Sequence, residues 1–332
     1  MPDPSLNLQP LLNIWNVGAI QSTKKPTTGG TIDNVLLITT DQNQYALRAS
    51  AHNDPTRLQR EHQLILWAHQ HNIPTPPPMS TPQGNTVVTY NKQVYTLFPF
   101  VNGYQIPRSD LQPNHITAMG SFLAQTHTTL ANYPTSQVRA RNLNKETDAN
   151  CETTLANLDR LIKKISALPY PKETDQHGLH RLQTRREWLQ TQPTSQNSDL
   201  LTLPYQAIHG DYQETNLFFQ NDQISSIIDW SAYVAPTTWE IARILDIVFG
   251  FQPNPSLTFL QAYHQHHPLS LKDLDTATHA YGLKNAHSLW LYEEIYDHDN
   301  HRLRQFITPG PFTPLCQTWQ TLYPLLQSHF SY

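Results

Sequence analysis

Residues 208–233 read IHGDYQETNLFFQNDQISSIIDWSAY, and this stretch sets several polar side chains into otherwise apolar sequence. Asp211 and Asn216 fall on an expected loop, and Asp229 ends the second of two short apolar runs. Asn221-Asp222 between the runs is a turn signal, so we predict a hairpin that returns Asp229 to Asn216. A carboxylate and an amide oxygen converging there suit Mg²⁺, which leaves room for phosphates. Asp211, held off the metal, would accept a hydroxyl proton, as phosphoryl transfer requires.

The sequence on either side predicts two regions of different character. NVLLITTD (34–41) with QYALRAS (44–50), and NTVVTY (85–90) with QVYTLFPFV (93–101), are typical of two hairpins around a helix over 54–72. From residue 114 onward the pattern is mainly helical, apart from the stretch around 206–230. We therefore predict an α+β fold with a small N-terminal antiparallel sheet lobe at 1–101 and a larger helical lobe at 102–332.

Composition excludes several classes of protein. The 332 residues carry a formal net charge of -4, which gives no basic field for nucleic acid. No run of about 18 apolar residues indicates a membrane span, and the first residues do not resemble a signal peptide. Two isolated cysteines, Cys151 and Cys316, indicate neither a metal site nor a disulfide framework. We expect a cytoplasmic protein without a membrane or nucleic-acid partner, and the oligomeric state stays open.

HGDYQETN followed by IIDW resembles the signature of the aminoglycoside phosphotransferase family, which includes kinases related to choline kinase and homoserine kinase. The likeness extends to LQREHQLILWAHQHNIPTPPPM, FLAQTH and APTTWEIARIL, and so covers most of the chain. It implies the protein-kinase-like two-lobed fold and phosphotransferase activity, with Mg²⁺ and ATP or GTP.

The resemblance also implies roles for the residues of the loop and hairpin. Asp211 matches the catalytic base, while Asn216 and Asp229 match the two metal ligands. His209 resembles the histidine that supports this loop through hydrogen bonds. Glu240 stands where the family commonly has aspartate.

In the first lobe, Arg48 takes the position of the strand lysine that contacts the α- and β-phosphates, and Glu61 would be its ion-pair partner. Gly29 and Gly30 would lie at the turn over the phosphates. Phe98, Phe100 and Val101 would line the adenine slot at the hinge. Arg48 departs from the family pattern, because arginine and lysine are not interchangeable at a phosphate, although some family members also carry arginine here. The loop KKPTTGGTIDN (24–34) is a second departure, since it matches a GxGxxG kinase loop poorly.

The segment YEEIYDHDNHRLRQF (292–306) gathers acidic residues in a chain with only 14% charged residues. Glu293 and Asp297 are one helical turn apart and could form an acidic pocket for a cationic acceptor, or simply a solvated face. Tyr292, Tyr296 and Trp290 would line that pocket or belong to the core.

The function predicted from these features is transfer of the γ-phosphate of ATP or GTP to a hydroxyl of a small, amine-bearing molecule such as an aminoglycoside, an amino alcohol or a homoserine-like compound. Two alternatives remain: a non-catalytic nucleotide-binding regulator on the same fold, and a kinase that acts on protein serine or threonine. Read separately, the polar residues of the opening stretch also fit a capping Asp, a loop Asn and an edge Asp on a hairpin.

Overall fold

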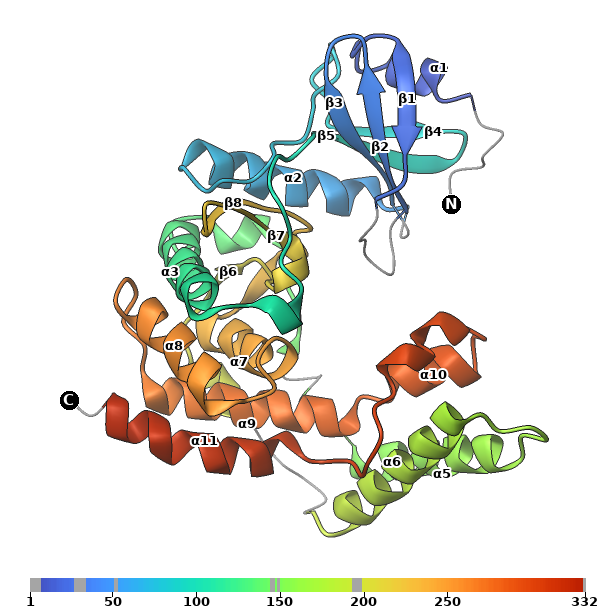
Figure 1. Cartoon of the computed structure of the whole chain (residues 1–332), viewed down its shortest axis with the longest axis vertical. Coiled ribbons are helices and arrows are strands. Elements are labelled where there is room, and N and C mark those ends of the chain that lie inside the picture. The colour runs from blue at the N-terminus through green and yellow to red at the C-terminus, as the bar shows by residue number, and fades with distance from the viewer. Residues whose placement is uncertain are drawn as a thin grey trace. The chain divides into compact units, whose positions relative to one another are not determined.

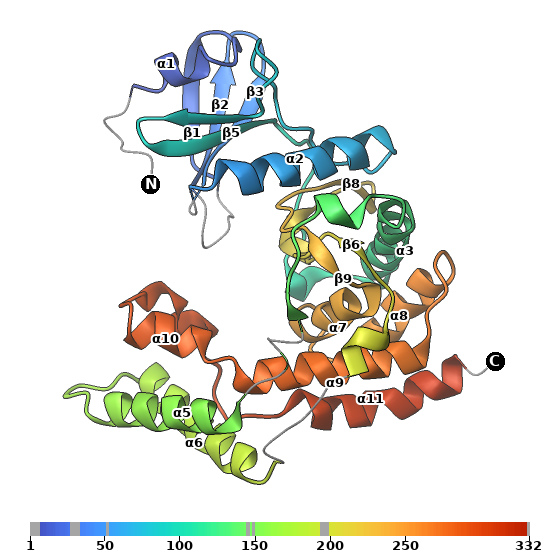
Figure 2. The same ribbon diagram turned by 180° about the vertical axis from the view of Figure 1, so that it is seen from behind.

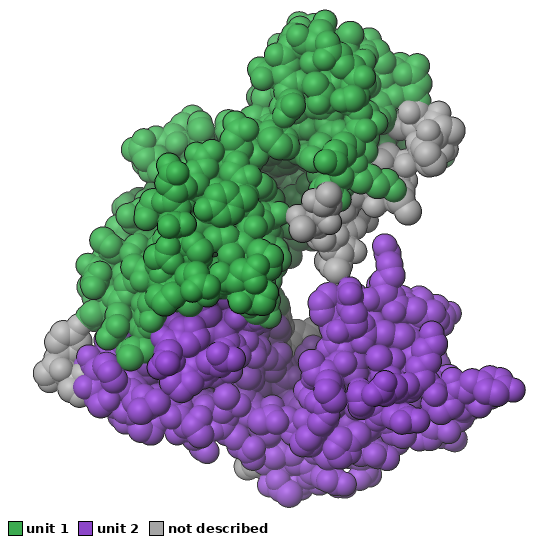
Figure 3. Space-filling model, viewed as in Figure 1, with its two compact units in different colours: residues 1–141, 205–240, 257–268 green, residues 142–204, 241–256, 269–332 purple. Residues whose placement is uncertain are grey.

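The computed structural model describes residues 7–26, 34–50, 53–143, 147, 150–192 and 199–330. The chain forms two compact units, which Figure 3 shows in different colours. Unit 1 consists of residues 1–141, 205–240 and 257–268, and unit 2 of residues 142–204, 241–256 and 269–332. The lobe boundary predicted after residue 101 stays a prediction. Within the described ranges, no helix is long and apolar enough to cross a membrane.

Unit 1 contains a five-stranded antiparallel sheet with the strand order β1-β2-β3-β5-β4 (Figure 1). Its strands are β1 (Ile20–Lys24), β2 (Asn34–Thr40), β3 (Gln44–Ala49), β4 (Val87–Tyr90) and β5 (Gln93–Pro99). Both predicted hairpins are present, and β1 is an additional edge strand that the sequence pattern did not predict. Three side chains of β3 are buried in one core: Tyr45, Leu47 and Ala49. This core also includes Trp15, which lies before β1 in the chain. Because successive side chains of a strand point to opposite faces, the Arg48 side chain points away from this core.

The helix α2 (Pro55–Gln70) begins and packs as its sequence predicts. Asp54 caps the helix by accepting a hydrogen bond from the Arg57 N–H at 3.1 Å, and Pro55 occupies the first turn, where its missing N–H costs nothing. Leu58 packs with Val87 of β4 and Val94 of β5. The helix is thereby fixed against the sheet, with Glu61 one turn after Arg57.

The remaining elements of unit 1 build the polar stretch that opened the sequence. After α1 (Gln9–Leu12) and the sheet come α3 (Pro113–Leu130) and the strands β6 (Tyr205–Ile208), β7 (Leu217–Gln220), β8 (Gln223–Ile227) and β9 (Tyr233–Pro236). β7 and β8 form the predicted hairpin, and β6 pairs with β9 in a second two-stranded sheet that was not predicted. Asn221 and Asp222 both have positive φ (49° and 61°), the conformation of a two-residue hairpin turn.

Unit 2 is helical. Its helices include α5 (Cys151–Ser166), α6 (Glu173–Gln190), α9 (Leu271–His287), α10 (Trp290–Tyr296) and α11 (Leu315–His329). Helices α5 and α6 lie side by side in both views, as do α9 and α11 (Figure 2). α7 (Thr237–Ile247) and α8 (Pro253–His264) contain residues of both units. Tyr292 and Tyr296 belong to a buried cluster with Leu158 and Leu161 of α5, so these two tyrosines are core residues.

Candidate active site

The loop between β6 and β7 carries the HGD motif, and it is fixed at its base by strand pairing. Ile208 pairs with Tyr233, and the Ser231 N–H donates to the His209 carbonyl at 3.0 Å. Gly210 has a φ of +84°, and a Cβ there would lie 2.5 Å from the Ser231 carbonyl oxygen. Only glycine fits this position, because both the backbone conformation and the close approach of the neighbouring chain exclude a side chain.

His209 is completely buried and holds two parts of the loop together. Its Nδ1 accepts a hydrogen bond from the Asp211 N–H at 3.2 Å, so the proton of the neutral ring sits on Nε2. Nε2 in turn lies 3.1 Å from the Ile228 carbonyl, to which it donates. The ring therefore joins the residue before Asp229 to the backbone of Asp211 and has no hydrogen left for a substrate.

Asp211 is half-buried, and its carboxylate is oriented by two amide side chains. Asn216 Nδ2 lies 3.0 Å from Asp211 Oδ2 and 2.8 Å from the Asp211 carbonyl oxygen, and it donates to both. Gln213 Nε2 donates to the same Oδ2 at 3.2 Å. Because the amide nitrogen of Asn216 faces Asp211, its Oδ1 is the atom that a cation would use.

Asn216 and Asp229 lie at the same end of the β7–β8 hairpin. Leu217 pairs with Ile227, and the Ile228 N–H donates to the Asn216 carbonyl at 2.9 Å. Asp229 has a φ of +61°, a conformation that non-glycine residues rarely adopt and that turns its side chain out of the strand direction. The pair offers one carboxylate and one amide oxygen, a donor set that fits a hard divalent cation. In the described part of the chain, no three His, Cys, Asp or Glu side chains gather as a metal cluster.

Arg48 connects the sheet to this hairpin. Its Nη2 lies 3.0 Å from Asp229 Oδ1, and its Nη1 lies 3.8 Å from Glu61 Oε1 on α2. The Glu61 side chain is 9% exposed, whereas that of Asp229 is 38% exposed and accessible to a ligand. The structure therefore brings Arg48, Glu61 and Asp229 together, and the shorter contact is the one to Asp229.

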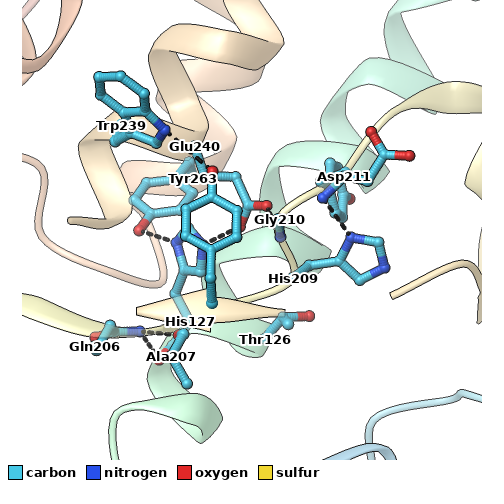
Figure 4. A network of polar contacts seen from close by, with 12 residues as sticks. Thr126, His127, Gln206, Ala207, His209, Gly210, Asp211, Trp239, Glu240 and Tyr263 are labelled. Carbon is cyan, nitrogen blue, oxygen red and sulfur yellow. Dashed lines mark hydrogen bonds and ion pairs between the residues drawn. The ribbon is translucent and has the colours of Figure 1, made fainter. Parts of the chain in front are cut away.

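Glu240 and His127 form a buried hydrogen-bonded pair that supports the loop and was not predicted from the sequence (Figure 4). Glu240 Oε1 accepts from the Gly210 N–H at 2.5 Å, and Glu240 Oε2 lies 2.9 Å from His127 Nε2. His127 Nδ1 lies 2.8 Å from the Tyr263 hydroxyl, and the His127 carbonyl accepts from Gln206 at 2.8 Å. Burial alone would raise the pKa of Glu240, but the hydrogen bonds from His127 and Gly210 hold the pKa below its ordinary value. The carboxylate is thus kept charged beneath the loop.

The hinge residues predicted for the adenine slot lie at and after the end of β5. Phe98 pairs with Ala46 of β3, and its ring packs against the His62 ring in a T-shaped arrangement at a centroid distance of 5.6 Å. The Phe100 N–H donates to the Gln44 carbonyl at 3.0 Å, and its side chain is 38% exposed. Val101 is half-buried. Gly29 and Gly30, predicted over the phosphates, lie outside the described residues.

The segment after the hinge is joined to the loop by contacts that the sequence pattern did not reveal. Tyr104 and Phe219 exchange two backbone hydrogen bonds at 2.8 and 3.1 Å. Arg108 Nε and Nη2 both reach Glu214 Oε1, at 3.1 and 3.0 Å, and Glu214 is 3% exposed. Direct hydrogen bonds therefore join the segment that follows β5 to the HGD loop and the β7–β8 hairpin within unit 1.

The predicted acceptor residues, Glu293 and Asp297, lie at α10 in unit 2 and contact basic side chains. Asp297 lies 2.8 Å from Arg160 Nη1 and 3.0 Å from Lys164 Nζ, and Glu293 lies 4.0 Å from Arg160 Nη2. These cations offset the acidic charge. That Glu293 and Asp297 bind the acceptor stays a prediction.

His62 on α2, close to Arg48, makes the stability of the protein depend on pH. Burial, with a smaller contribution from the Arg48 charge, lowers the pKa of His62 to about 3. Its Nδ1 lies 2.8 Å from the Thr86 hydroxyl. Because the unfolded chain binds a proton at this histidine below about pH 6.5 and the folded chain does not, stability falls as the pH falls from 6.5 towards 3.

We expect the free energy of unfolding to drop by about 2 kcal/mol more between pH 7 and pH 5 in the wild type than in His62→Asn, whose amide replaces the Nδ1 contact without titrating. Urea unfolding at the two pH values measures this difference. Equal pH dependence of the two proteins would contradict a depressed pKa at this position.

A model of the phosphotransferase enzyme family matches residues 24–274. The chain belongs to this family. This membership confirms that the chain is a phosphotransferase, the enzyme class predicted from HGDYQETN and IIDW. A search of curated proteins gave no match.

Solved structures of phosphotransferases share the fold of the whole chain. An aminoglycoside phosphotransferase from Alicyclobacillus acidocaldarius subsp. acidocaldarius DSM 446 is 14% identical with a TM-score of 0.64, covering 98% of this chain and 97% of that chain. A microcompartment-associated aminopropanol kinase is 13% identical with a TM-score of 0.59, covering 96% and 97%. An amicoumacin kinase, solved with AMP-PNP and Ca²⁺, is 15% identical with a TM-score of 0.58, covering 94% and 97%. The predicted kinase-like α+β fold is confirmed.

Proposed function

We propose that this phosphotransferase moves the γ-phosphate of ATP or GTP to a hydroxyl group of a small, amine-bearing molecule, with Mg²⁺ as the cofactor. The observation that carries the proposal is the convergence of Asp211, Asn216 and Asp229 within one loop and hairpin, with Arg48 in contact with Asp229. The amine-bearing acceptor is supported by the names of similar structures, which include an aminoglycoside phosphotransferase and an aminopropanol kinase.

Each side chain then has a defined task. Asp211 binds the acceptor hydroxyl and takes its proton, while Asn216 and Gln213 fix the carboxylate through their N–H groups. Asn216 Oδ1 and the Asp229 carboxylate would hold Mg²⁺, which neutralises phosphate charge when bound. Arg48 contacts the phosphates with a planar guanidinium that suits two oxygens at once, and Glu61 orients it. His209 keeps Asp211 and Asp229 in register.

The test is nucleotide binding with and without Mg²⁺. Asp229→Ala is expected to weaken Mg²⁺-dependent binding of AMP-PNP by about 10–100-fold, because it removes the charged ligand of the cation. Asp222→Ala is the matched control, since Asp222 has the same φ of 61° at the far end of the same hairpin. Both variants carry the strain of alanine at positive φ, so only a difference between them reports on the cation.

Calorimetric titration with AMP-PNP, in Mg²⁺ and in EDTA, measures the effect. Unchanged affinity in Asp229→Ala would remove Asp229 from the metal site. Absence of nucleotide binding in the wild type, under any condition, would favour the non-catalytic alternative. Turnover of a protein substrate, but of no small hydroxyl-bearing amine, would favour the protein kinase.

A further inference from the structure

A cavity of about 210 Å³ lies beside the first half of α2 in unit 1. Three arginines line it: Arg57 and Arg60 from α2, and Arg139 from the segment that precedes unit 2 in the chain. The carboxylates in its walls are Asp54 and Glu61. None of these arginines belongs to the proposed phosphotransfer site.

The two carboxylates of the cavity already have other contacts. Asp54 accepts from the Arg57 backbone N–H as the cap of α2, and Glu61 lies 3.8 Å from Arg48. Across the described ranges, no ion pair involves the guanidinium groups of Arg57, Arg60 or Arg139. The cavity therefore has a surplus of positive charge that the described protein does not balance with a direct contact.

Arg139 is held in place by its backbone and by an aromatic ring. The Val234 N–H donates to the Arg139 carbonyl at 3.1 Å, which attaches this segment to β9. The guanidinium carbon lies 5.7 Å from the centroid of the Tyr233 ring. Burial, followed by the charges of Arg57 and Arg141, lowers the pKa of Arg139, and Tyr233 and Glu61 offset this only in part, so positive charge is concentrated around Arg139. A fixed cation among like charges is prepared for an anion.

We propose that this cavity binds a ligand bearing a phosphate group, at a site separate from the nucleotide. Guanidinium groups present forked N–H donors that match the oxygens of a phosphate, and Arg57, Arg60 and Arg139 approach the cavity from two different segments. The volume is below the roughly 300 Å³ at which pockets for drug-sized ligands begin, which favours a small group over a whole nucleotide. Free phosphate and a phosphomonoester share this chemistry.

The position of the cavity links it to α2. Arg57 precedes Glu61 by one helical turn, and Glu61 both lines the cavity and pairs with Arg48. An anion bound by Arg57 and Arg139 would join the start of α2 to the segment that pairs with β9. The proposal concerns binding and does not depend on the roles assigned to Asp211, Asn216 or Asp229.

The experiment is calorimetric titration of the full chain with inorganic phosphate in low-chloride buffer, with and without saturating AMP-PNP and Mg²⁺. Arg57→Gln and Arg139→Gln are each expected to weaken phosphate binding by about tenfold or more, the usual effect of losing a charged hydrogen-bonding partner. Arg302→Gln is the control, since it removes one exposed arginine from unit 2 without touching the cavity. Arg57→Lys keeps the charge and loses the fork, so an intermediate affinity is expected.

Results of three kinds would overturn the proposal. The first is phosphate binding that Arg57→Gln and Arg139→Gln leave unchanged in folded protein, as judged by circular dichroism, or no phosphate binding at all. The second is loss of phosphate binding when AMP-PNP saturates the protein, which would assign the anion to the nucleotide site. The third is acetate binding as tightly as phosphate. Titration with O-phosphoserine then distinguishes free phosphate from a phosphomonoester as the ligand. If O-phosphoserine binds more tightly than inorganic phosphate, the ligand is a phosphomonoester.

Discussion

Asp211→Asn is expected to lower turnover by about 10²–10⁴-fold, the usual contribution of a positioned general base. The substitution removes basicity and little else, because the asparagine oxygen can still accept from Asn216 and Gln213, which contact Oδ2 in the wild type. Binding of AMP-PNP with Mg²⁺ is expected to stay within a few-fold of wild type. Steady-state phosphorylation of a hydroxyl-bearing amine measures turnover, and calorimetry measures binding.

The matched control is Asp299→Asn, which makes the same chemical change at an exposed residue whose φ of 55° suits asparagine. It is expected to leave turnover unchanged. Full turnover of Asp211→Asn would exclude Asp211 as the base. A loss of turnover accompanied by an equal loss of nucleotide affinity would indicate that the substitution disturbs the loop instead of the proton transfer.

Glu240→Ala is expected to lower the free energy of unfolding by about 2–5 kcal/mol, because it leaves two buried N–H donors without an acceptor. Glu240 is 1% exposed and His127 is fully buried, so no bulk water replaces the lost carboxylate. The His127 ring and the Gly210 N–H would lose the acceptors that they now have at 2.9 and 2.5 Å. Urea denaturation measures the change.

Glu240→Gln separates charge from shape. Its oxygen can accept from Gly210 while its amide donates to His127 Nε2, if the ring proton moves to Nδ1 and faces the Tyr263 hydroxyl. We therefore expect a smaller loss of about 1–2 kcal/mol. Glu187→Ala on the exposed side of α6 is the control and is expected to stay within about 0.5 kcal/mol of wild type. A glutamine variant less stable than the alanine variant would contradict the proton shift.

The lowered pKa of Glu240 also predicts how the stability of the wild type depends on pH. Because the folded pKa lies below that of the unfolded chain, the stabilisation is present above the ordinary glutamate range and is lost as the pH falls through the folded value.

Local sequence signals predicted the elements whose partners are close in the chain. The Asn221-Asp222 turn sets the register of β7 and β8, and this register brings the flanking residues Asn216 and Ile228 into contact. Asp54 followed by Pro55 predicted the start of α2 for the same reason: a cap depends on the next three residues. The main prediction of a sheet followed by helices also rested on short-range periodicity.

Contacts between residues far apart in the sequence were not predictable from one chain. β6 and β9 are four residues each, too short for a period, and their pairing spans the whole HGD motif. The Glu240–His127 pair joins residues 113 positions apart, and only their presence in apolar helical sequence hinted that both are buried. Arg108 and Glu214 are 106 positions apart in the same way. The contact of Arg48 with Asp229, which spans the sheet and the hairpin, belongs to this group as well.

That last contact has a thermodynamic consequence. Arg48 Nη2 lies 3.0 Å from Asp229 Oδ1, so the proposed phosphate ligand and the proposed metal ligand are in direct contact with each other. A cation that takes Asp229 releases the guanidinium for a polyphosphate, and a polyphosphate that takes Arg48 releases the carboxylate for a cation. With these proposed roles, the binding of either ligand separates the Arg48–Asp229 ion pair. The second ligand then binds without the free-energy cost of that separation. The cation and the polyphosphate would then bind with positive and reciprocal coupling.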